Sequence, residues 1–406
     1  MSEWRSATVE ECLVPVDLPS TKVQTRDYKA SGAYPIVDQG QQLVAGRTDE
    51  REGLISELPV VVFGDHTRAL KYIDFPFVRG ADGTQVLRPR TGILPSFFYY
   101  ALRALEIPSR GYNRHFKILK EKEIRFPDDL DEQSNVANLL RLIEDASRLQ
   151  EQQRQAWARC KRAVSRDVFT RGLRSEEQQE TVIGSVPSSW ALVEFSSVRE
   201  WLQYGTSTHC TTEINDQPVL RIPNIESGRV NPTDLKYAKV EAADATKYRL
   251  EDGDLLFIRT NGVVGRLGNC AVFAGNPKGA LFASYLIRAR LKLNRIDPYY
   301  AAYFFGSENG TQLIGGRATP AADGKFNLNT GTIDNLPLPL PPTLEEQREI
   351  VSVLRALDQK IDLHERKRVV LEGLFKSLLH KLMTGEIRIS DLDLSALGQS
   401  TTRFAA

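Results

Sequence analysis

Four loop-like stretches of this sequence combine basic side chains with amides, hydroxyls or an aromatic ring. Two lie in the first half of the chain, in "FGDHTR" and "SRGYNRHFK", and supply His66, Thr67, Arg68, Arg110, Tyr112, Asn113, Arg114 and Lys117. Two lie in the second half, in "FIRTNGVVGR" and "GGRATPAADGKFNLN", and supply Arg259, Thr260, Asn261, Arg266, Arg317, Lys325 and Asn327. Cationic groups bind phosphate oxygens, and arginine, amide and hydroxyl groups also bind base edges. These stretches suggest contact with nucleic acid, although plain turns and solvated loops would show the same pattern.

Recognisable catalytic motifs are absent from the sequence. No GxxxxGK[ST] loop is present for a nucleoside triphosphate, and "ADGK" lacks its spacing. No glycine-rich turn marks a dinucleotide or adenosylmethionine site, and His209 and Cys210 have no evident third partner. The sequence therefore offers no evident catalytic residue and no evident metal or cofactor site.

The bulk composition sets further limits. With 406 residues the chain has the length of two or three domains, and its net charge of +1 neither requires nor excludes nucleic acid. No apolar run approaches the roughly 18 residues of a membrane span. The N-terminal stretch lacks the pattern of a signal peptide. Four widely separated cysteines predict reduced, buried thiols in a cytoplasmic protein.

One segment of the sequence occurs twice. "RFPDDLDEQSNVANLLRLI" (125–143) aligns without a gap on "PLPPTLEEQREIVSVLRAL" (339–357), at a constant offset of 214 positions. A proline before each helix start keeps the preceding chain out of the helical region. Asp129 and Glu132 have the spacing of a capping box, as do Thr343 and Glu346. Each copy therefore predicts a helix that begins at a defined residue.

Apolar residues recur every seven positions after both helix starts. They are Val136, Leu140, Ile143, Trp157 and Val164 in the first copy and Ile350, Leu354, Leu357, Leu371 and Leu378 in the second. The pattern predicts two helices of about 40 residues, about 55–60 Å long, that pair as an antiparallel coiled coil. We call the row of apolar positions along each helix its seam. In the middle of each seam polar residues replace the apolar ones, at Gln150 and Arg154 in the first helix and at His364 and Arg368 in the second. Either these polar layers meet each other, or they face solvent or a partner subunit.

A block of mixed helix and strand character precedes each long helix. Trp4 in the first block corresponds to Trp190 in the second, and a strand-like run followed by a polar loop occurs in both. A proline-started aromatic helix also occurs in both, at 92–105 and 295–307. We predict an α+β fold, in which two long helices separate two α/β domains in a pseudo-twofold internal repeat. The predicted boundaries are 1–127 and 189–338 for the domains, 128–172 and 339–390 for the helices, 173–188 for a linker and 391–406 for a tail.

The whole arrangement resembles the specificity subunit of type I restriction-modification systems, from Trp4 to about Ile389. Four sequence segments are similar to segments of the second block in that family: "LRIPNI" (220–225), "GDLLFIRTN" (253–261), "FASYLIR" (282–288) and "LPLPLPPTLEEQ" (336–347). The first block is less similar. The resemblance implies a cytoplasmic phage-defence protein that binds double-stranded DNA, with each block a target recognition domain for one half of a bipartite site. It also implies that the two helices set the spacing between the halves.

The resemblance further implies partner subunits. Methylation subunits would dock on this chain, and restriction subunits that translocate and cut DNA would join them. Adenosylmethionine, ATP and Mg would be bound by those partners, so this chain itself would perform no chemistry. Two other hypotheses are open from the sequence: a coiled-coil adaptor that binds only proteins, and a methyltransferase or nuclease with an unrecognised active site.

Overall fold

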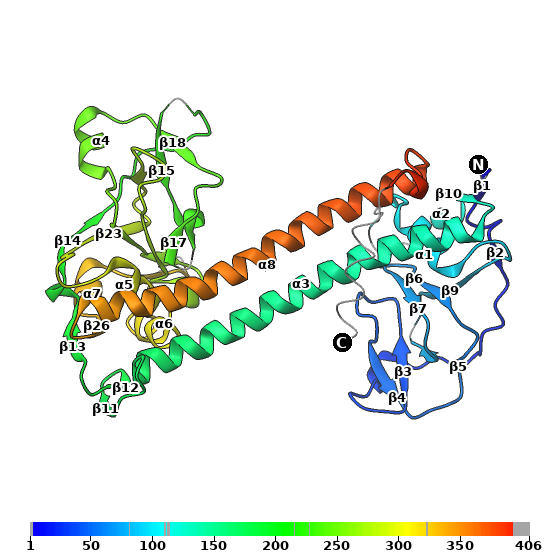
Figure 1. Cartoon of the computed structure of the whole chain (residues 1–406), viewed down its shortest axis with the longest axis horizontal. Coiled ribbons are helices and arrows are strands. Elements are labelled where there is room, and N and C mark those ends of the chain that lie inside the picture. Colours follow the sequence, from blue (N-terminus) through cyan, green and yellow to red (C-terminus); the bar gives the residue numbers. More distant parts are fainter. Residues whose placement is uncertain are drawn as a thin grey trace. The chain divides into compact units, whose positions relative to one another are not determined.

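The structure consists of two compact units. The computed structural model describes residues 3–80, 82–108, 111, 114–214, 216–226, 228–321 and 324–392 (Figure 1). The first unit comprises Met1–Glu151 and Glu365–Ala406, and the second comprises Gln152–His364. Each unit contains one of the predicted blocks together with parts of both long helices.

Both predicted long helices are present. They are α3 (Leu130–Arg171) and α8 (Leu344–Thr384), of 42 and 41 residues. The Asp129 carboxylate accepts a hydrogen bond from the N–H of Asp131 (2.9 Å), and Thr343 Oγ1 accepts one from the N–H of Glu346 (3.2 Å). These bonds satisfy N–H groups that the first turn of a helix leaves without a partner. Local chemistry therefore fixes both helix starts, as predicted.

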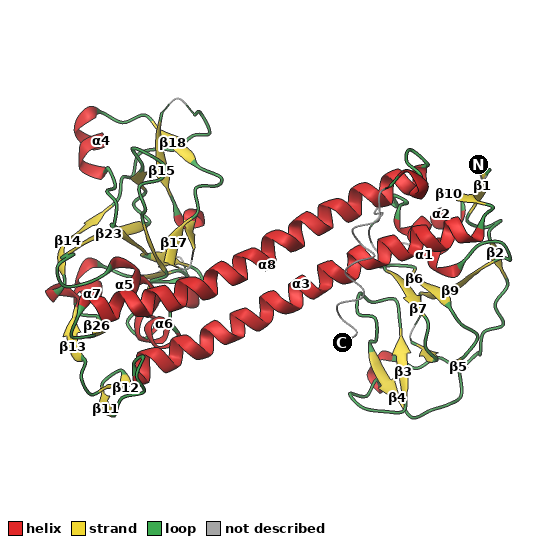
Figure 2. Ribbon diagram, in the orientation of Figure 1, coloured by secondary structure: helices red, strands yellow, loops and turns green. Residues whose placement is uncertain are grey.

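The first unit contains two four-stranded sheets and one strand pair (Figure 2). The first sheet has the spatial order β2 (Leu13–Val14), β9 (Thr84–Pro89), β6 (Val60–Gly64) and β7 (Leu70–Ile73). The second has the order β4 (Gly46–Thr48), β3 (Tyr34–Val37), β8 (Phe77–Arg79) and β5 (Leu54–Ile55). The strand pair consists of β1 (Trp4–Thr8) and β10 (Glu123–Pro127). Two short helices accompany them, α1 (Pro95–Arg103) and α2 (Phe116–Lys120). Aromatic residues of α1 form one core with α3 and with the end of α8.

The second unit contains a larger sheet and four smaller ones. The six-stranded sheet is β14 (Arg199–Tyr204), β23 (Leu286–Leu291), β19 (Leu255–Ile258), β21 (Cys270–Val272), β17 (Gly228–Val230) and β16 (Ile225–Glu226). Two smaller sheets have three strands each: β18 (Lys236–Ala238), β15 (Gln217–Leu220) and β22 (Leu281–Phe282) form one, and β20 (Thr260–Asn261), β25 (Phe326–Asn327) and β24 (Thr319–Pro320) form the other. The remaining two are strand pairs, β13 (Ala191–Glu194) with β26 (Pro337–Leu340) and β11 (Gln178–Thr181) with β12 (Gly184–Pro187). The shorter helices are α4 (Ala242–Tyr248), α5 (Pro298–Phe305), α6 (Glu308–Gly315) and α7 (Thr330–Asp334). Aromatic residues of α5 share a core with α8 and with the end of α3.

The two units repeat one topological plan. An antiparallel pair lies at the centre of each, β6 with β9 in the first and β19 with β23 in the second. A parallel pair accompanies it, β3 with β8 and β15 with β22. The proline-started aromatic helices α1 and α5 follow at equivalent points of the chain. The predicted α+β fold with an internal repeat is therefore confirmed.

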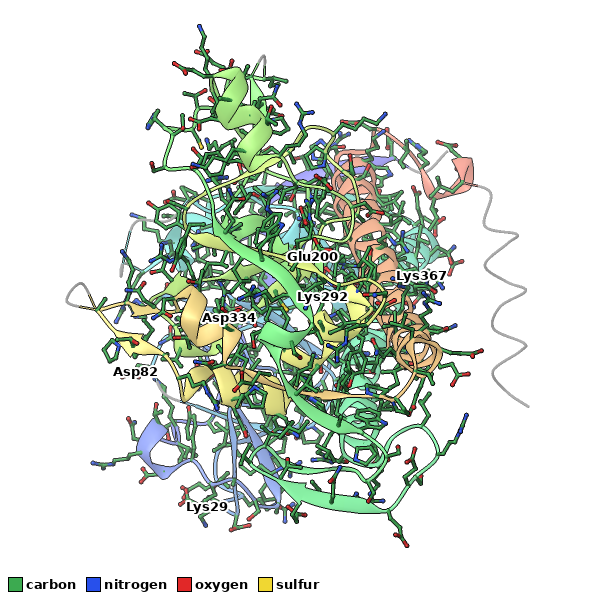
Figure 3. The ribbon with its side chains drawn as sticks, turned by 90° about the vertical axis from the view of Figure 1, so that its left-hand side faces the viewer. Lys29, Asp82, Glu200, Lys292, Asp334 and Lys367 are labelled. Atoms are coloured by element: carbon green, nitrogen blue, oxygen red, sulfur yellow. The ribbon has the colours of Figure 1, made fainter. Side chains whose placement is uncertain are left out.

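Ion pairs reinforce the large sheet of the second unit. The Asp254 carboxylate, on a residue that is 1% exposed, accepts two hydrogen bonds from Arg290 (2.9 and 3.0 Å) and lies 3.5 Å from Arg288. At another point, Arg199 donates two hydrogen bonds to Asp334 (2.8 and 2.7 Å), which is labelled in Figure 3. Bidentate pairs of this kind hold both partners in one orientation.

All four cysteines are free. Cys12 and Cys270 are buried, Cys210 is half-buried and Cys160 is exposed. The prediction of buried thiols is therefore wrong for Cys160, which lies on the solvent-facing side of α3 beside the exposed Arg159. In the part of the chain that the structure describes, no helix is sufficiently long and apolar to cross a membrane.

Candidate nucleic-acid interface

In the first unit, two of the predicted loops lie side by side. Asp65, which directly follows β6, is buried, and its carboxylate accepts a hydrogen bond from the N–H of Phe116 (2.8 Å). The Asp65 carbonyl accepts another from the N–H of His115 (2.9 Å). Arg114 and Lys117 flank this junction and are exposed. Residues 65–68 and 114–117 therefore lie together in one part of the first unit, and Arg110, Tyr112 and Asn113 lie outside the described residues.

The side chains of the 66–68 loop contact neighbouring backbone. The Arg68 guanidinium donates to the carbonyl of Ile107 (2.9 Å), and the residue has a positive φ of 61°. The Thr67 hydroxyl donates to the carbonyl of Gln39, and the His66 N–H donates to the Gln39 side chain (3.3 Å). Thr67 and Arg68 thus help to shape the loop, and Gln39 lies against it, a neighbour that sequence reasoning did not single out.

In the second unit, the other two predicted loops join as a small sheet. β20 pairs with β25 in antiparallel register, so that Thr260 faces Asn327, and β24 adds to the other side of β25. The N–H of Leu328 also donates to the carbonyl of Arg259 (2.7 Å). Lys325 is exposed at the turn that leads into β25. The structure therefore brings together residues that are more than 60 positions apart in the sequence.

The same backbone hydrogen bonds connect the loops in both units. The N–H of Asp65 donates to Gly83 (2.8 Å), and the N–H of Arg259 donates to Tyr285 (3.1 Å). The carbonyls of Asp65 and Arg259 then accept from His115 and from Leu328, respectively. Asp65 and Arg259 are therefore equivalent positions, as are Gly83 and Tyr285. One framework is built twice, with different side chains at its central position.

The side chain of Arg259 lies against an aromatic ring. Its guanidinium lies over the ring of Tyr204, 4.7 Å from the ring centre, and donates to the carbonyl of Ser284 (3.4 Å). Among the described residues its buried Nε–H has no hydrogen-bond partner. Tyr204 and Tyr285 are 37% and 55% exposed, which makes them available to a ligand. Sequence reasoning missed both tyrosines, because nothing in the sequence indicates that they lie beside Arg259.

Arg317 and Arg266 differ in their surroundings from Arg259. Arg317 is exposed two residues before β24 and donates to the carbonyl of Leu313 (3.3 Å). Arg266 lines a cavity of about 610 Å³ that also includes Arg229, Asp358 and Asp362. Arg229 forms two hydrogen bonds with Asp362, which raise the pKa of Arg229. The structure therefore places Arg266 near carboxylates of α8, whereas the β20–β25 loops lie around Arg259.

The predicted coiled-coil residues contact the short aromatic helix of a block as well as the other long helix. Those most buried are Val136, Leu140 and Ile143 in the first unit and Ile350 and Leu354 in the second. The first three share a core with α1 and with the end of α8, and the other two share one with α5 and the end of α3. Leu371 and Leu378 pack on the first core, Val164 and Leu357 pack on the second, and Trp157 is half-buried. Each helix start therefore packs on its own block as well as on the opposite helix.

The polar middle of the seams contains ion pairs. Arg368 pairs with Glu365 (2.7 Å) and Glu372 (2.5 Å) on its own helix and lies 3.8 Å from Glu151 of α3. In the second unit, Lys161 of α3 pairs with Asp358 of α8 (2.5 Å). Charged residues of the two helices thus meet across the seam within each unit, Arg368 with Glu151 and Lys161 with Asp358. Direct pairing of Gln150 and Arg154 with His364 and Arg368 stays a prediction.

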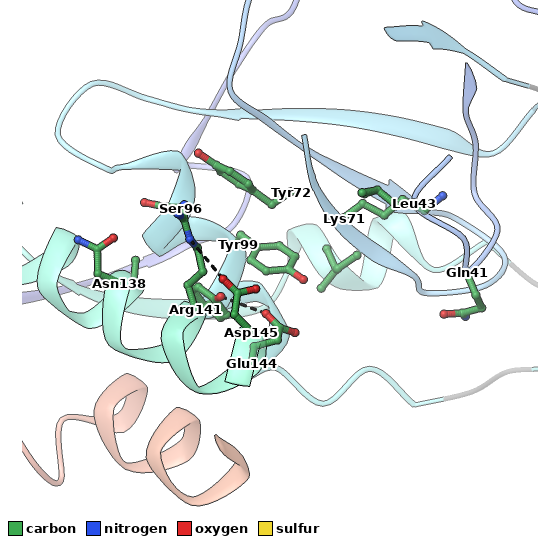
Figure 4. A pocket seen from close by; sticks show the side chains of 13 residues that line it. Gln41, Leu43, Lys71, Tyr72, Ser96, Tyr99, Asn138, Arg141, Glu144 and Asp145 are labelled. Atoms are coloured by element: carbon green, nitrogen blue, oxygen red, sulfur yellow. Dashed lines mark hydrogen bonds and ion pairs between the residues drawn. The ribbon is translucent and has the colours of Figure 1, made fainter. Parts of the chain in front are cut away.

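A cavity of about 270 Å³ lies between α1, α3 and β7 in the first unit (Figure 4). Its polar groups are paired: Tyr100 donates to Glu144 (3.1 Å), and Arg141 lies 4.0 Å from Asp145. Lys71 donates to the carbonyl of Asp38 (2.8 Å), and burial lowers the pKa of Lys71. Throughout the described ranges, no group of three or more His, Cys, Asp or Glu residues could hold a metal ion.

If the chain binds DNA through these loops, we expect Tyr204→Ala to weaken that binding by about 2–5-fold, whereas Tyr204→Phe should bind as wild type does. A cation over an aromatic face at a partly exposed site contributes about 0.5–1 kcal/mol, and phenylalanine retains that face. Fluorescence anisotropy titrations on one DNA duplex would measure the difference. Equal losses for the two variants would show that the ring does not position Arg259.

The chain is thus built from two α/β blocks of one plan, and each block packs on a long helix and has its own cluster of basic and polar loops. Residues 188–373 match the family model described as the type I restriction modification DNA specificity domain. The chain is 30% identical over 215 residues to a putative type I restriction enzyme MjaX specificity subunit of Methanocaldococcus jannaschii, covering 52% of this chain and 49% of that protein. It is 28% identical over 200 residues to the type I restriction enzyme EcoKI specificity subunit of Escherichia coli, covering 48% and 42%.

The solved structures agree in fold over nearly the whole chain. A type I restriction-modification S subunit from M. genitalium superposes with a TM-score of 0.62 at 17% identity, covering 94% of this chain and 96% of that one. A chain from a study of complex assembly and conformational transition of the type I R-M system gives a TM-score of 0.52 at 15% identity, covering 93% and 97%. Over about half of its length the chain is therefore similar to type I restriction enzyme specificity subunits, and it shares the fold of the solved S subunits. It spans about half the length of the curated relatives that it matches.

Proposed function

We propose that this chain is the DNA-recognition subunit of a type I restriction-modification complex and that each unit binds one half of a bipartite DNA site. The observation that carries the proposal is the loop framework that is built twice. Asp65 and Arg259 hold equivalent positions in it, but the exposed residues beside them differ: Arg114 and Lys117 in the first unit, and Tyr204 and Tyr285 in the second. The two units therefore present different chemistry on the same backbone. A bipartite, asymmetric site requires two readers with a common scaffold and different contact residues.

The long helices support a spacing role. Helices of 42 and 41 residues are each about 60 Å long, which is long compared with the roughly 34–36 Å of one turn of DNA. We propose that they set the distance between the half-sites and dock methylation subunits, which restriction subunits then join. Adenosylmethionine, ATP and Mg would be bound by those partners in the cytoplasm, and this chain would perform no chemistry itself.

The proposal can be tested by exchanging one block. The full chain, purified with its methylation subunits, is used to select binders from a randomised DNA library, and the selected sites are sequenced. Replacing residues 190–335 by the corresponding block of another specificity subunit should change one half of the selected motif and leave the other half unchanged. If the motif does not change, or if wild type selects no motif, the chain is not the DNA reader, as a protein-only adaptor would require.

A further inference from the structure

Gln133 and Gln347 are the same residue in the two copies of the repeated segment, and both are buried. They are 0% and 1% exposed, respectively. A buried polar side chain is costly unless its hydrogen bonds are made, so a glutamine at such a position indicates specific partners. Each lies in the first turn of a long helix, where the helix meets its own block.

Both side-chain amides bind the backbone just before an aromatic helix. The Gln133 carbonyl oxygen accepts from the N–H of Leu94 (2.8 Å), and its amide nitrogen donates to the carbonyl of Gly92 (2.9 Å). The Gln347 oxygen accepts from the N–H of Asp297 (2.8 Å), and its nitrogen donates to the carbonyl of Arg295 (3.1 Å). We call these two sets of bonds the glutamine clamps.

The partners of the two clamps are equivalent. Leu94 and Asp297 are the N-cap residues of α1 and α5, and the carbonyl bound in each case lies two residues earlier. The amide therefore pairs with an N–H and a C=O of the short segment that leads from a turn into the aromatic helix. Because these are backbone groups, the bonds do not depend on the side chains of the block. One clamp can therefore hold two blocks whose surfaces differ.

Two further polar contacts flank each clamp. The indole N–H of Trp4 donates to Glu132 (3.2 Å), and that of Trp190 donates to Glu346 (3.0 Å). The hydroxyl of Tyr303 donates to Asp358 of α8 (2.8 Å), as Tyr100 does to a carboxylate of α3. Burial raises the pKa of Tyr303, which keeps its hydroxyl protonated as a donor. Each block is thus attached to its helix by directional bonds at three points.

We propose that Gln133 and Gln347 are positioning residues that fix how each recognition block is held on its helix, and thereby restrict the subunit to one spacer length between its half-sites. This inference rests on the proposed function. Apolar contacts between block and helix have no directional preference, whereas the clamp allows one orientation of the segment before α1 or α5. Without the clamp, the block can tilt on the helix while its reading loops remain intact.

The test compares Gln133→Met, Gln347→Met and the double variant with a matched control, Gln153→Met, at an exposed position of α3. Methionine is close to glutamine in length and flexibility but cannot form the clamp bonds. The full chain with its methylation subunits selects sites from a randomised DNA library, and both half-motifs and spacer lengths are read. Wild type and Gln153→Met should select one spacer. The clamp variants should select the same half-motifs, with spacers one base pair shorter or longer enriched to within about 3-fold of the original.

A single spacer length in all three clamp variants, with half-motifs unchanged, would overturn the inference and leave the proposed function standing. If wild type selects no half-motifs, it is the proposed function that fails. Thermal melting by circular dichroism checks that each variant folds. Where a methionine variant does not fold, the Gln→Asn variant replaces it, because asparagine keeps the amide but is one methylene too short to span both backbone groups.

Discussion

Replacing Arg114, Arg259 and Lys325 together by alanine is expected to weaken DNA binding by about 100-fold or more. These cations lie on the loop clusters of the two units, and under the proposed function each of them would contact a phosphate or a base edge. Even about 1 kcal/mol per lost contact gives this factor, and hydrogen bonds to charged groups often contribute more. The slope of log affinity against log salt concentration should fall by about 0.9 for each cation that contacts a phosphate, and so by at most about 2.7. Titrations at several salt concentrations would measure both quantities.

A second triple variant separates local contacts from bulk charge. Lys29, Lys278 and Lys367 are exposed, and their replacement by alanine changes the net charge by the same amount (Lys29 and Lys367 are labelled in Figure 3). Lys278 follows β21, at the end of the large sheet opposite Arg259. We expect this control to bind DNA within about 3-fold of wild type. Equal losses in both triple variants would assign the effect to overall charge, and no loss in either would favour an adaptor that binds only proteins.

The long helices could be predicted from the sequence because their signals are local. A proline, a capping side chain and a seven-residue apolar period all lie within one segment, and its second copy strengthens the assignment. The roles of Glu132 and Glu346 were predicted less well. Their spacing indicates a capping box, but each accepts a hydrogen bond from the indole of a tryptophan in its block. Those tryptophans lie 128 and 156 positions away, so a local rule could not include them.

The binding loops could be predicted one by one, but their association could not. Basic and amide residues mark each loop, whereas the junctions depend on strand pairing and on the buried carboxylate of Asp65. The same limit applies to Tyr204, which reaches Arg259 from the edge strand of a six-stranded sheet. The equivalence of Asp65 and Arg259 could not be predicted from the sequence either, because their side chains differ and only their backbone hydrogen bonds are the same.

Asp254→Asn is expected to destabilise the second unit by about 3–5 kcal/mol. The substitution keeps the shape of the side chain but removes the negative charge beside Arg288, a residue that is 4% exposed. Burial lowers the pKa of Arg288, so its cation depends on the nearby carboxylate for compensation. Removing one partner of a buried pair leaves the other charge uncompensated, which accounts for the size of the effect. Urea unfolding monitored by circular dichroism would give the change in unfolding free energy.

The double variant Asp254→Asn with Arg288→Met tests this electrostatic explanation. If the cost comes from an unpaired buried cation, replacing that cation by an apolar side chain of similar length should restore part of the lost stability. Arg290 and Arg288 lie on the ring of Trp201, at 4.9 and 4.5 Å from its centre, and methionine can keep the apolar part of the second contact. Glu200→Gln, at an exposed carboxylate of the same sheet, should change stability by no more than about 0.5 kcal/mol. A double variant less stable than Asp254→Asn alone would show that the hydrogen bonds of Arg288 to the surrounding chain, and not its charge, hold this part of the sheet together.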